Sequence, residues 1–173
     1  MKIYITGISG TGKTTLANAL HTKGFKTISI DETPGLCTWV NRNDGSKVHY
    51  EGVVDKEFIA GHKWVCFRED LRNLMSNDEN VFVCGVAENQ DEYLDLFDKV
   101  ILLQCEPEIF LQRLLHRTGN PFGKDKSAQE YLVSTYKEFE NNLIKKGAVQ
   151  INVNRSLDEV IEDIIKYKII KLK

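Results

Sequence analysis

Short runs of apolar residues recur along the chain and predict buried β-strands. Five runs of this kind stand at 2–6, 26–30, 80–85, 99–104 and 148–153. Most are continuously apolar rather than alternating, which is typical of strands that are covered on both faces, as in a parallel sheet.

Helical patterns fill most of the stretches between these runs. The spacing of apolar positions predicts helices at 13–22, 63–76, 90–97, 107–118, 127–146 and 156–169. Pro107 suits the first turn of its helix, because the missing N–H has no partner there anyway. Ser127 followed by Glu130, and Ser156 followed by Glu159, predict N-terminal capping boxes for the last two helices.

The alternation of strands and helices predicts an α/β fold in three layers, with a five-stranded parallel sheet between helices. With 173 residues, the chain fits a single domain over 1–173. Three polar or glycine-containing segments interrupt the alternation, at 31–61, 85–90 and 117–126. Ligands of open α/β sheets bind beyond the carboxyl ends of the strands, so we expect these segments around that edge.

Residues 7–14, Gly-Ile-Ser-Gly-Thr-Gly-Lys-Thr, match the phosphate-binding pattern G-x-x-x-x-G-K-[ST] between a predicted strand and a predicted helix. The amides of Gly10, Gly12 and Lys13 are expected to hold phosphate oxygens at the helix N-terminus. Lys13 can reach the β- and γ-phosphates, and the Thr14 hydroxyl can ligate Mg²⁺. The predicted nucleotide-binding set also includes Gly7, Ser9, Thr11 and Thr15. The sequence therefore predicts that the chain binds ATP with Mg²⁺.

Composition and charge limit the kinds of binding partner and the cellular location that we expect. The net charge is −2, with 42% hydrophobic and 28% charged residues, so we do not expect nucleic acid as a partner. No apolar run is long enough for a membrane span, and the N-terminus enters a strand directly rather than a secretory signal. We expect a cytoplasmic monomer or homodimer. The four cysteines lack a C-x-x-C pair and suit reduced thiols.

Two further motifs carry a family resemblance. Residues 110–117, Phe-Leu-Gln-Arg-Leu-Leu-His-Arg, contain an R-x-x-x-R spacing, and residues 151–160, Ile-Asn-Val-Asn-Arg-Ser-Leu-Asp-Glu-Val, suggest a last strand, a loop and a final helix. With the phosphate loop, these motifs resemble the small P-loop kinases, such as adenylate, shikimate, gluconate and nucleoside-kinase-like proteins. The resemblance spans nearly the whole chain. It implies a P-loop NTPase fold with a small lid at about 117–127 and an acceptor-binding segment at about 31–76.

The resemblance also implies roles for single residues. Arg113 would stack on adenine, with Asn154 and Arg155 in the adenine loop, and Arg117 would contact the transferring phosphate. Asp31 would meet the acceptor hydroxyl or hold Mg²⁺ through water, which makes Lys13, Asp31 and Arg117 the catalytic candidates. The structural alternatives are that Arg113 and Arg117 are solvated side chains on a surface helix, and that Asp31 is a turn residue after a strand.

One position departs from the pattern of the nucleoside monophosphate kinases of the adenylate type, in which an Asp-Gly pair follows the third strand and helps to organise Mg²⁺. Here Cys84 precedes Gly85, and a neutral thiol cannot replace a carboxylate charge. The departure favours a gluconate- or shikimate-like arrangement in which Asp31 takes this role, with Glu88 as the alternative.

The long segment after Asp31 is expected to form the acceptor site. Its aromatic and cationic residues are Trp39, Arg42, His49, Tyr50, His62, Trp64 and Arg68. Trp64 and Arg68 stand four apart and would share a helical face. An aromatic ring beside a cation suits a nucleobase-phosphate or another flat, anionic acceptor. The alternative for Trp39 and Trp64 is a place in the core.

These observations predict a phosphotransferase that moves the γ-phosphoryl group of ATP to a small hydroxyl compound, such as a nucleoside or a sugar acid. One alternative is a nucleoside monophosphate kinase, which Cys84 disfavours. Another is an ATP-binding or ATP-hydrolysing switch protein without a small-molecule acceptor. A polynucleotide 5′-hydroxyl kinase would need a basic groove that the composition does not indicate.

Overall fold

The computed structural model describes residues 1–118, 120 and 122–169. Its main sheet has five parallel strands in the order β2-β6-β1-β7-β8. The strands are β1 (Lys2–Thr6), β2 (Thr27–Ser29), β6 (Val81–Cys84), β7 (Lys99–Gln104) and β8 (Val149–Asn152). All five predicted strands are confirmed, and with them the α/β class and the parallel sheet. The first strand in sequence lies in the middle of the sheet, so the loop that follows it is central to the carboxyl edge.

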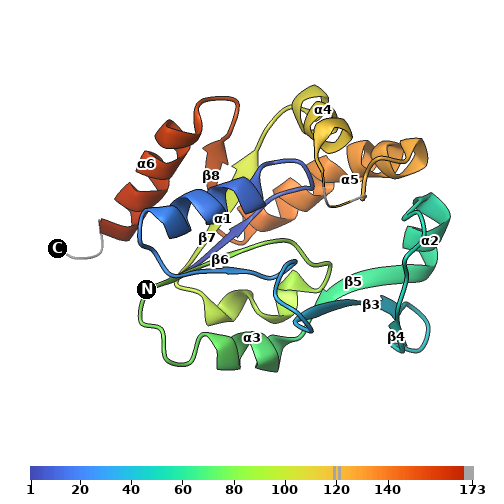
Figure 1. Cartoon of the computed structure of the whole chain (residues 1–173), viewed down its shortest axis with the longest axis horizontal. Coiled ribbons are helices and arrows are strands. Elements are labelled where there is room, and N and C mark those ends of the chain that lie inside the picture. Colours follow the sequence, from blue (N-terminus) through green and yellow to red (C-terminus); the bar gives the residue numbers. More distant parts are fainter. Residues whose placement is uncertain (119, 121, 170–173) are drawn as a thin grey trace.

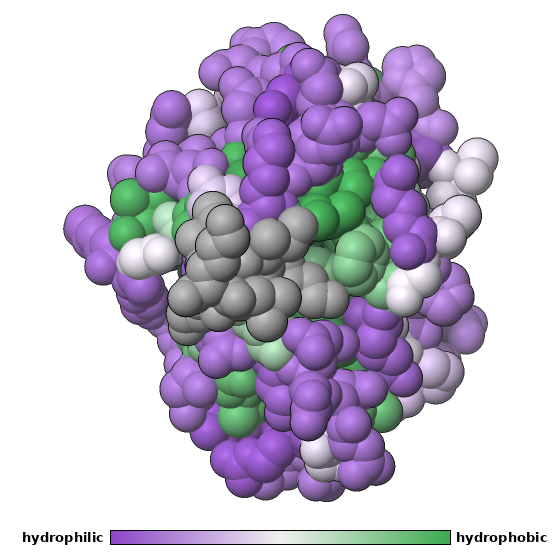
Figure 2. Space-filling model, turned by 90° about the vertical axis from the view of Figure 1, so that its left-hand side faces the viewer, coloured by the Kyte–Doolittle hydropathy of each residue, from purple (hydrophilic) through white to green (hydrophobic). Residues whose placement is uncertain are grey.

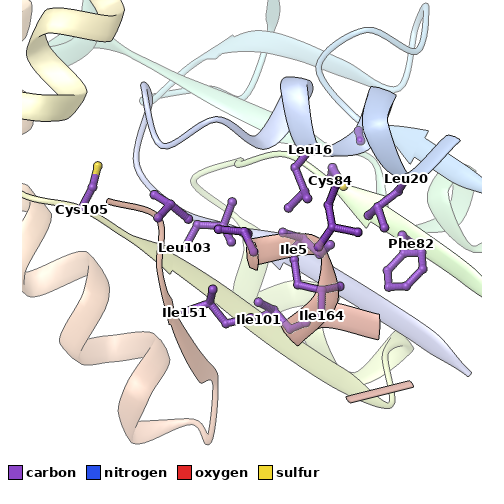
Figure 3. Packing of buried hydrophobic residues seen from close by; sticks show 14 of the residues in the cluster. Ile5, Leu16, Leu20, Phe82, Cys84, Ile101, Leu103, Cys105, Ile151 and Ile164 are labelled. Carbon is purple, nitrogen blue, oxygen red and sulfur yellow. The ribbon is translucent and has the colours of Figure 1, made fainter. Parts of the chain in front are cut away.

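Helices cover both faces of this sheet (Figure 1). They are α1 (Lys13–Thr22), α3 (Arg68–Leu74), α4 (Pro107–His116), α5 (Lys126–Lys145) and α6 (Leu157–Ile169). On one face, Ile5 and Ile101 pack against Leu16 and Leu20 of α1 and against Ile164 of α6 (Figure 3). The alternate strand positions point to the other face, where Tyr4 and Val83 join Leu71 of α3 in a second cluster. Because both faces are buried, the strands carry continuous apolar runs.

A second, antiparallel sheet stands beside the main one, in the order β4-β3-β5. Its strands are β3 (Cys37–Asn41), β4 (Lys47–Val48) and β5 (His62–Cys66), and the short helix α2 (Lys56–Gly61) precedes β5. The helix predicted at 63–76 is therefore wrong in its first part, and only 68–74 is helical. Short apolar runs are ambiguous by periodicity, and pairing with β3 decides for the strand. As a consequence, Trp64 and Arg68 do not share a helical face.

The structure corrects two smaller predictions. The stretch 90–97 forms two 3-10 turns, η1 (Gln90–Glu92) and η2 (Leu94–Leu96), rather than one α-helix. The N-cap of α5 is Asp125, whose carboxylate accepts from the amides of Ser127 and Ala128, so the capping box predicted at Ser127 is wrong. The cap lies two residues earlier than predicted, and the Ser127 hydroxyl donates to the Asp125 carboxylate instead of capping the helix.

The other two helix starts agree with the sequence. Pro107 is the first residue of α4. The capping box of α6 is confirmed, because Ser156 and Glu159 exchange hydrogen bonds between side chain and backbone.

The end with the N-terminus has a mostly hydrophilic surface (Figure 2). The loop between β1 and α1 and the second sheet lie toward the opposite end (Figure 1).

Among the described residues, no helix combines the length and the apolar content that crossing a membrane requires.

Candidate active site

A large cavity of about 1630 Å³ lies at the carboxyl edge of the main sheet. Its walls come from the β1–α1 loop, the residues after β2 and β6, the second sheet, the end of α4, one face of α5 and the start of α6. Segments that are far apart in the sequence thus meet at one place, as expected for an open α/β sheet.

The β1–α1 loop forms one wall of the cavity. Lys13 is the first residue of α1, and its Nζ donates to the carbonyl oxygens of Gly7 at 2.7 Å and Ile8 at 3.0 Å. The Lys13 side chain is buried, and burial lowers its pKa to about 8, although the nearby Asp31 carboxylate opposes this shift. The ammonium group is therefore held inside the loop that matches the phosphate-binding pattern.

Gly10 has no room for a side chain. Its φ is +92°, and a Cβ there would lie 2.5 Å from the backbone oxygen of Phe110 in α4. We expect Gly10→Ala to lose about 1–2 kcal/mol of unfolding free energy to left-handed strain and about 1–3 kcal/mol more to the clash. Urea unfolding without nucleotide measures this loss.

Gly12 provides the matched control. Its φ is +93°, but a Cβ there would meet no atom within 4 Å. Gly12→Ala should therefore show the strain without the clash. Equal losses in the two variants would contradict the packing of α4 against the loop.

Asp31 follows β2 and lines the same cavity as the β1–α1 loop. Its Oδ1 accepts a hydrogen bond from Nε1 of Trp64 at 3.1 Å. The surrounding protein raises the pKa of Asp31 by desolvation, and the charge of Lys13 and the Trp64 hydrogen bond oppose this rise. The carboxylate is therefore more basic than an ordinary aspartate, which suits a proton acceptor.

Arg117 lies just past the end of α4, and its amide donates to the Arg113 carbonyl at 3.0 Å. The predicted helix at 107–118 thus stops at His116. The Arg117 guanidinium donates to the carbonyls of Asn120 and Phe122, and it lines the cavity. Burial lowers its pKa, and the Asp31 charge opposes that shift. The structure therefore groups the three residues predicted to be catalytic. Gly119 and Pro121 of the predicted lid lie outside the described residues.

Two of the three predicted adenine-binding residues line the cavity, and the third does not. Arg113 lines the cavity and donates from Nη2 to the Val153 carbonyl at 3.1 Å. Arg155 also lines it, and its guanidinium pairs with Asp163 of α6. Asn154 is not among the lining residues; its amide bonds Asn152 in the turn after β8.

Cys84, Glu88 and Asp31 differ in how well they suit Mg²⁺ as ligands. Burial raises the pKa of Cys84 to about 12, so this thiol is neutral. The Glu88 carboxylate is bound by Arg42, whose Nη2 donates to Oε1 at 2.7 Å. Within the described residues, no group of three or more His, Cys, Asp and Glu side chains could hold a metal. Both predicted Mg²⁺ ligands, the exposed Thr14 hydroxyl and the Asp31 carboxylate, line the cavity and carry the hard oxygens that suit Mg²⁺.

Five of the seven predicted acceptor residues line the cavity, and two do not. The residues of this set that line the cavity are Trp39, His49, Tyr50, His62 and Trp64. Arg42 and Arg68 do not line it. Arg42 binds Glu88, and Arg68 pairs with Asp95 of η2. The cationic half of the predicted acceptor site is therefore neutralised by local carboxylates.

Sequence reasoning missed the contribution of α5. Tyr131, Thr135, Glu138 and Asn142 of this helix line the cavity. Their spacing of four, three and four residues places them on one face of the helix. This periodicity was the available signal, but nothing in it distinguishes a cavity wall from a core face.

Fold and site together define a P-loop NTPase domain. The family described as "AAA domain" matches residues 3–142, and the chain belongs to this family. A Halobacterium salinarum protein that carries an adenylate kinase name is 30% identical over 124 residues, covering 70% of this chain and 61% of that protein. The chain thus matches less than two thirds of the length of that relative.

Two other proteins match over nearly their full length. A shikimate kinase of Bacillus anthracis is 24% identical over 94% of both chains. The solved structure of deoxyadenosine kinase from M. mycoides superposes with a TM-score of 0.62 at 19% identity, over 96% of this chain and 98% of that one. The predicted resemblance to small P-loop kinases is confirmed.

Proposed function

We propose that this protein is a small-molecule kinase, which transfers the γ-phosphoryl group of ATP to a hydroxyl group of a small acceptor. One observation carries the proposal: Lys13 of the phosphate loop, Asp31 and Arg117 interact electrostatically within one cavity. A phosphate donor site and a basic carboxylate therefore face the same space. The kinase names of the relatives support this function.

The residues suit an in-line transfer. The acceptor oxygen would attack the γ-phosphorus while the bond to the bridging oxygen of ADP breaks, and the hydroxyl proton would pass to Asp31. Lys13 and Arg117 would neutralise charge on the transferring group and on the departing ADP. The segments 31–76 and 117–127 would hold the acceptor and exclude water from the reacting phosphate.

Magnesium fits the donor set of this site. Thr14 and Asp31, the latter through water, would hold it together with phosphate oxygens of the nucleotide. Bound there, Mg²⁺ would neutralise phosphate charge. Glu88 is a poorer candidate because Arg42 already satisfies its carboxylate.

Acceptor-dependent ADP formation tests the function. The protein is incubated with ATP and Mg²⁺, alone and with neutral nucleosides, nucleoside monophosphates, shikimate or gluconate. At least one hydroxyl acceptor should accelerate ADP release and appear as a phosphorylated product by mass spectrometry. Hydrolysis that no acceptor changes would contradict the proposal and favour a switch protein. Phosphorylation of a monophosphate alone would instead identify a nucleoside monophosphate kinase.

A further inference from the structure

We propose that the acceptor is a neutral nucleoside, in preference to a sugar acid or a nucleoside monophosphate. This inference rests on the proposed function and concerns the part of the cavity beyond Asp31. Three features of that part carry it: a wall of aromatic rings, a lining without an available arginine or lysine, and a carboxylate fixed beside one of the rings.

The aromatic wall is built by the pairing of β3 with β5. Trp39 lies directly opposite Trp64, and their ring centroids are 5.4 Å apart. The amide of Phe67 donates to the Leu36 carbonyl, which makes Trp39 and Trp64 a non-hydrogen-bonded pair, the kind in which side chains approach most closely. Both tryptophans are partly exposed and line the cavity.

Other rings extend this wall. Phe58 of α2 contacts Trp39 edge to face at 5.1 Å between centroids. Tyr50 and His62 stack on Phe58 at 3.8 and 4.2 Å. Phe58 itself does not line the cavity, and the rings that do are Trp39, Tyr50, His62 and Trp64. These four rings offer planar surface, which suits a flat heteroaromatic ring better than a non-planar sugar acid.

The charges of this region oppose an anionic acceptor. Four carboxylates line the cavity in the segments after β2 and β6: Asp31, Glu32, Glu51 and Glu88. Of the described residues that line the cavity, the arginines and lysines are Lys13, Arg113, Arg117 and Arg155, all from the phosphate loop, the end of α4 and the β8–α6 turn. None comes from the segment 31–76. A carboxylate or phosphate of an acceptor would be desolvated there without a paired cation, which is costly.

Arg42 follows β3, three residues after Trp39, and its guanidinium is engaged by other groups. Its Nη2 binds the Glu88 carboxylate, and its Nε donates to the Ile59 carbonyl at 3.1 Å. The Glu88 amide in turn donates to the Trp64 carbonyl at 2.8 Å, which ties the pair to the aromatic wall. Glu88 therefore acts as a specificity residue, because it withholds Arg42 from an anionic acceptor.

Trp64 links the wall to the reacting group. Its indole Nε1 donates to Oδ1 of Asp31, and the backbone of Val86 also hydrogen-bonds this carboxylate. A carboxylate has about four acceptor sites, so acceptor capacity remains for the acceptor hydroxyl. The acceptor should therefore place a flat ring against the aromatic wall and a hydroxyl group at Asp31. A molecule that does both consists of a planar heterocycle that carries a hydroxylated group. A neutral nucleoside has both parts and no charge.

Tryptophan fluorescence tests this inference directly, because the chain has only two tryptophans and both belong to the wall. The protein, with a non-hydrolysable ATP analogue and Mg²⁺, is titrated with adenosine, cytidine, thymidine, their 5′-monophosphates, ribose, shikimate and gluconate. Excitation at the red edge of the indole band avoids absorption by the bases. At least one nucleoside should quench the emission and bind about tenfold more tightly than its monophosphate. Tighter binding of a monophosphate or a sugar acid would overturn the inference.

A substitution of Glu88 gives a second, independent readout. Glu88→Gln should release Arg42 and improve binding of nucleoside monophosphates about tenfold, with little change for the nucleosides. Glu69→Gln is the matched control, because Glu69 pairs with Arg72 on α3 and neither residue lines the cavity. Unchanged monophosphate binding in Glu88→Gln would contradict the assigned role of Arg42 and Glu88.

The outcomes separate this inference from the kinase function. If ATP phosphorylates shikimate or gluconate but no nucleoside, the kinase function stands and the nucleoside inference falls. If nucleosides bind and quench, but no acceptor accelerates ADP formation, the binding site stands and the kinase function falls.

Discussion

Replacement of Lys13 by methionine is expected to reduce phosphoryl transfer at least about 100-fold, because one preorganised positive charge at the transferring phosphate is lost. Methionine approximates the volume of this buried side chain without its charge. The affinity for ATP should fall as well. Steady-state kinetics and calorimetric titration with ATP and Mg²⁺ measure the two effects.

The pH dependence adds a signature that a loss of packing would not produce. Lys13 has a pKa of about 8, so the charged form that attracts phosphate is present below this value and is lost above it. ATP affinity of the unmodified protein should therefore weaken as pH rises past 8, by up to about tenfold per pH unit, and Lys13→Met should remove this dependence.

Lys23→Met is the matched control for this substitution. Lys23 lies at the other end of α1, and its side chain is 48% exposed. Neither turnover nor the pH dependence should change in that variant. Normal turnover in Lys13→Met would contradict the assignment of the β1–α1 loop as the phosphate site.

Replacement of Asp31 by asparagine should lower kcat by about 10²–10⁴-fold and lower ATP affinity far less, since the residue would act mainly on the acceptor proton. Asparagine can still accept the hydrogen bond from Trp64, so the local structure should remain. In the unmodified protein, kcat should fall as pH drops through the pKa of Asp31. Because desolvation by the cavity walls raises this pKa, the loss should begin at a higher pH than for a freely solvated aspartate.

Glu32→Gln is the control for Asp31→Asn, because Glu32 is adjacent, exposed and also lines the cavity. It should keep most of the activity. An equal loss in both variants would point to a general effect of negative charge in the cavity. Full activity in Asp31→Asn would return Asp31 to a structural role at the end of β2.

The sequence was informative wherever local patterns decide the structure. Continuous apolar runs predicted the parallel strands, because strands buried on both faces need apolar residues at every position. Ser156 and Glu159 predicted the start of α6, because a capping box involves only neighbouring residues. The same local reasoning was wrong at 63–76, where His62–Cys66 pairs with β3, more than twenty residues earlier in the chain.

The acceptor region shows the limits of such reasoning most clearly. From the sequence, Arg42 and Arg68 were expected to attract an anion. In the fold, Glu88 and Asp95 occupy them, and those carboxylates lie 46 and 27 residues away in the chain. A sequence pattern shows which charges exist, but the net field in a cavity depends on which charges are paired.

By itself, the sequence determined the donor half of this protein: the phosphate loop, its flanking strand and helix, and the α/β class. These follow from backbone conformation and burial within short segments. The tertiary structure alone decided the acceptor half, because Trp39, Trp64, Asp31 and Glu88 come together only when β3 pairs with β5 beside the main sheet. Contacts between distant segments depend on that pairing, and no local pattern encodes it.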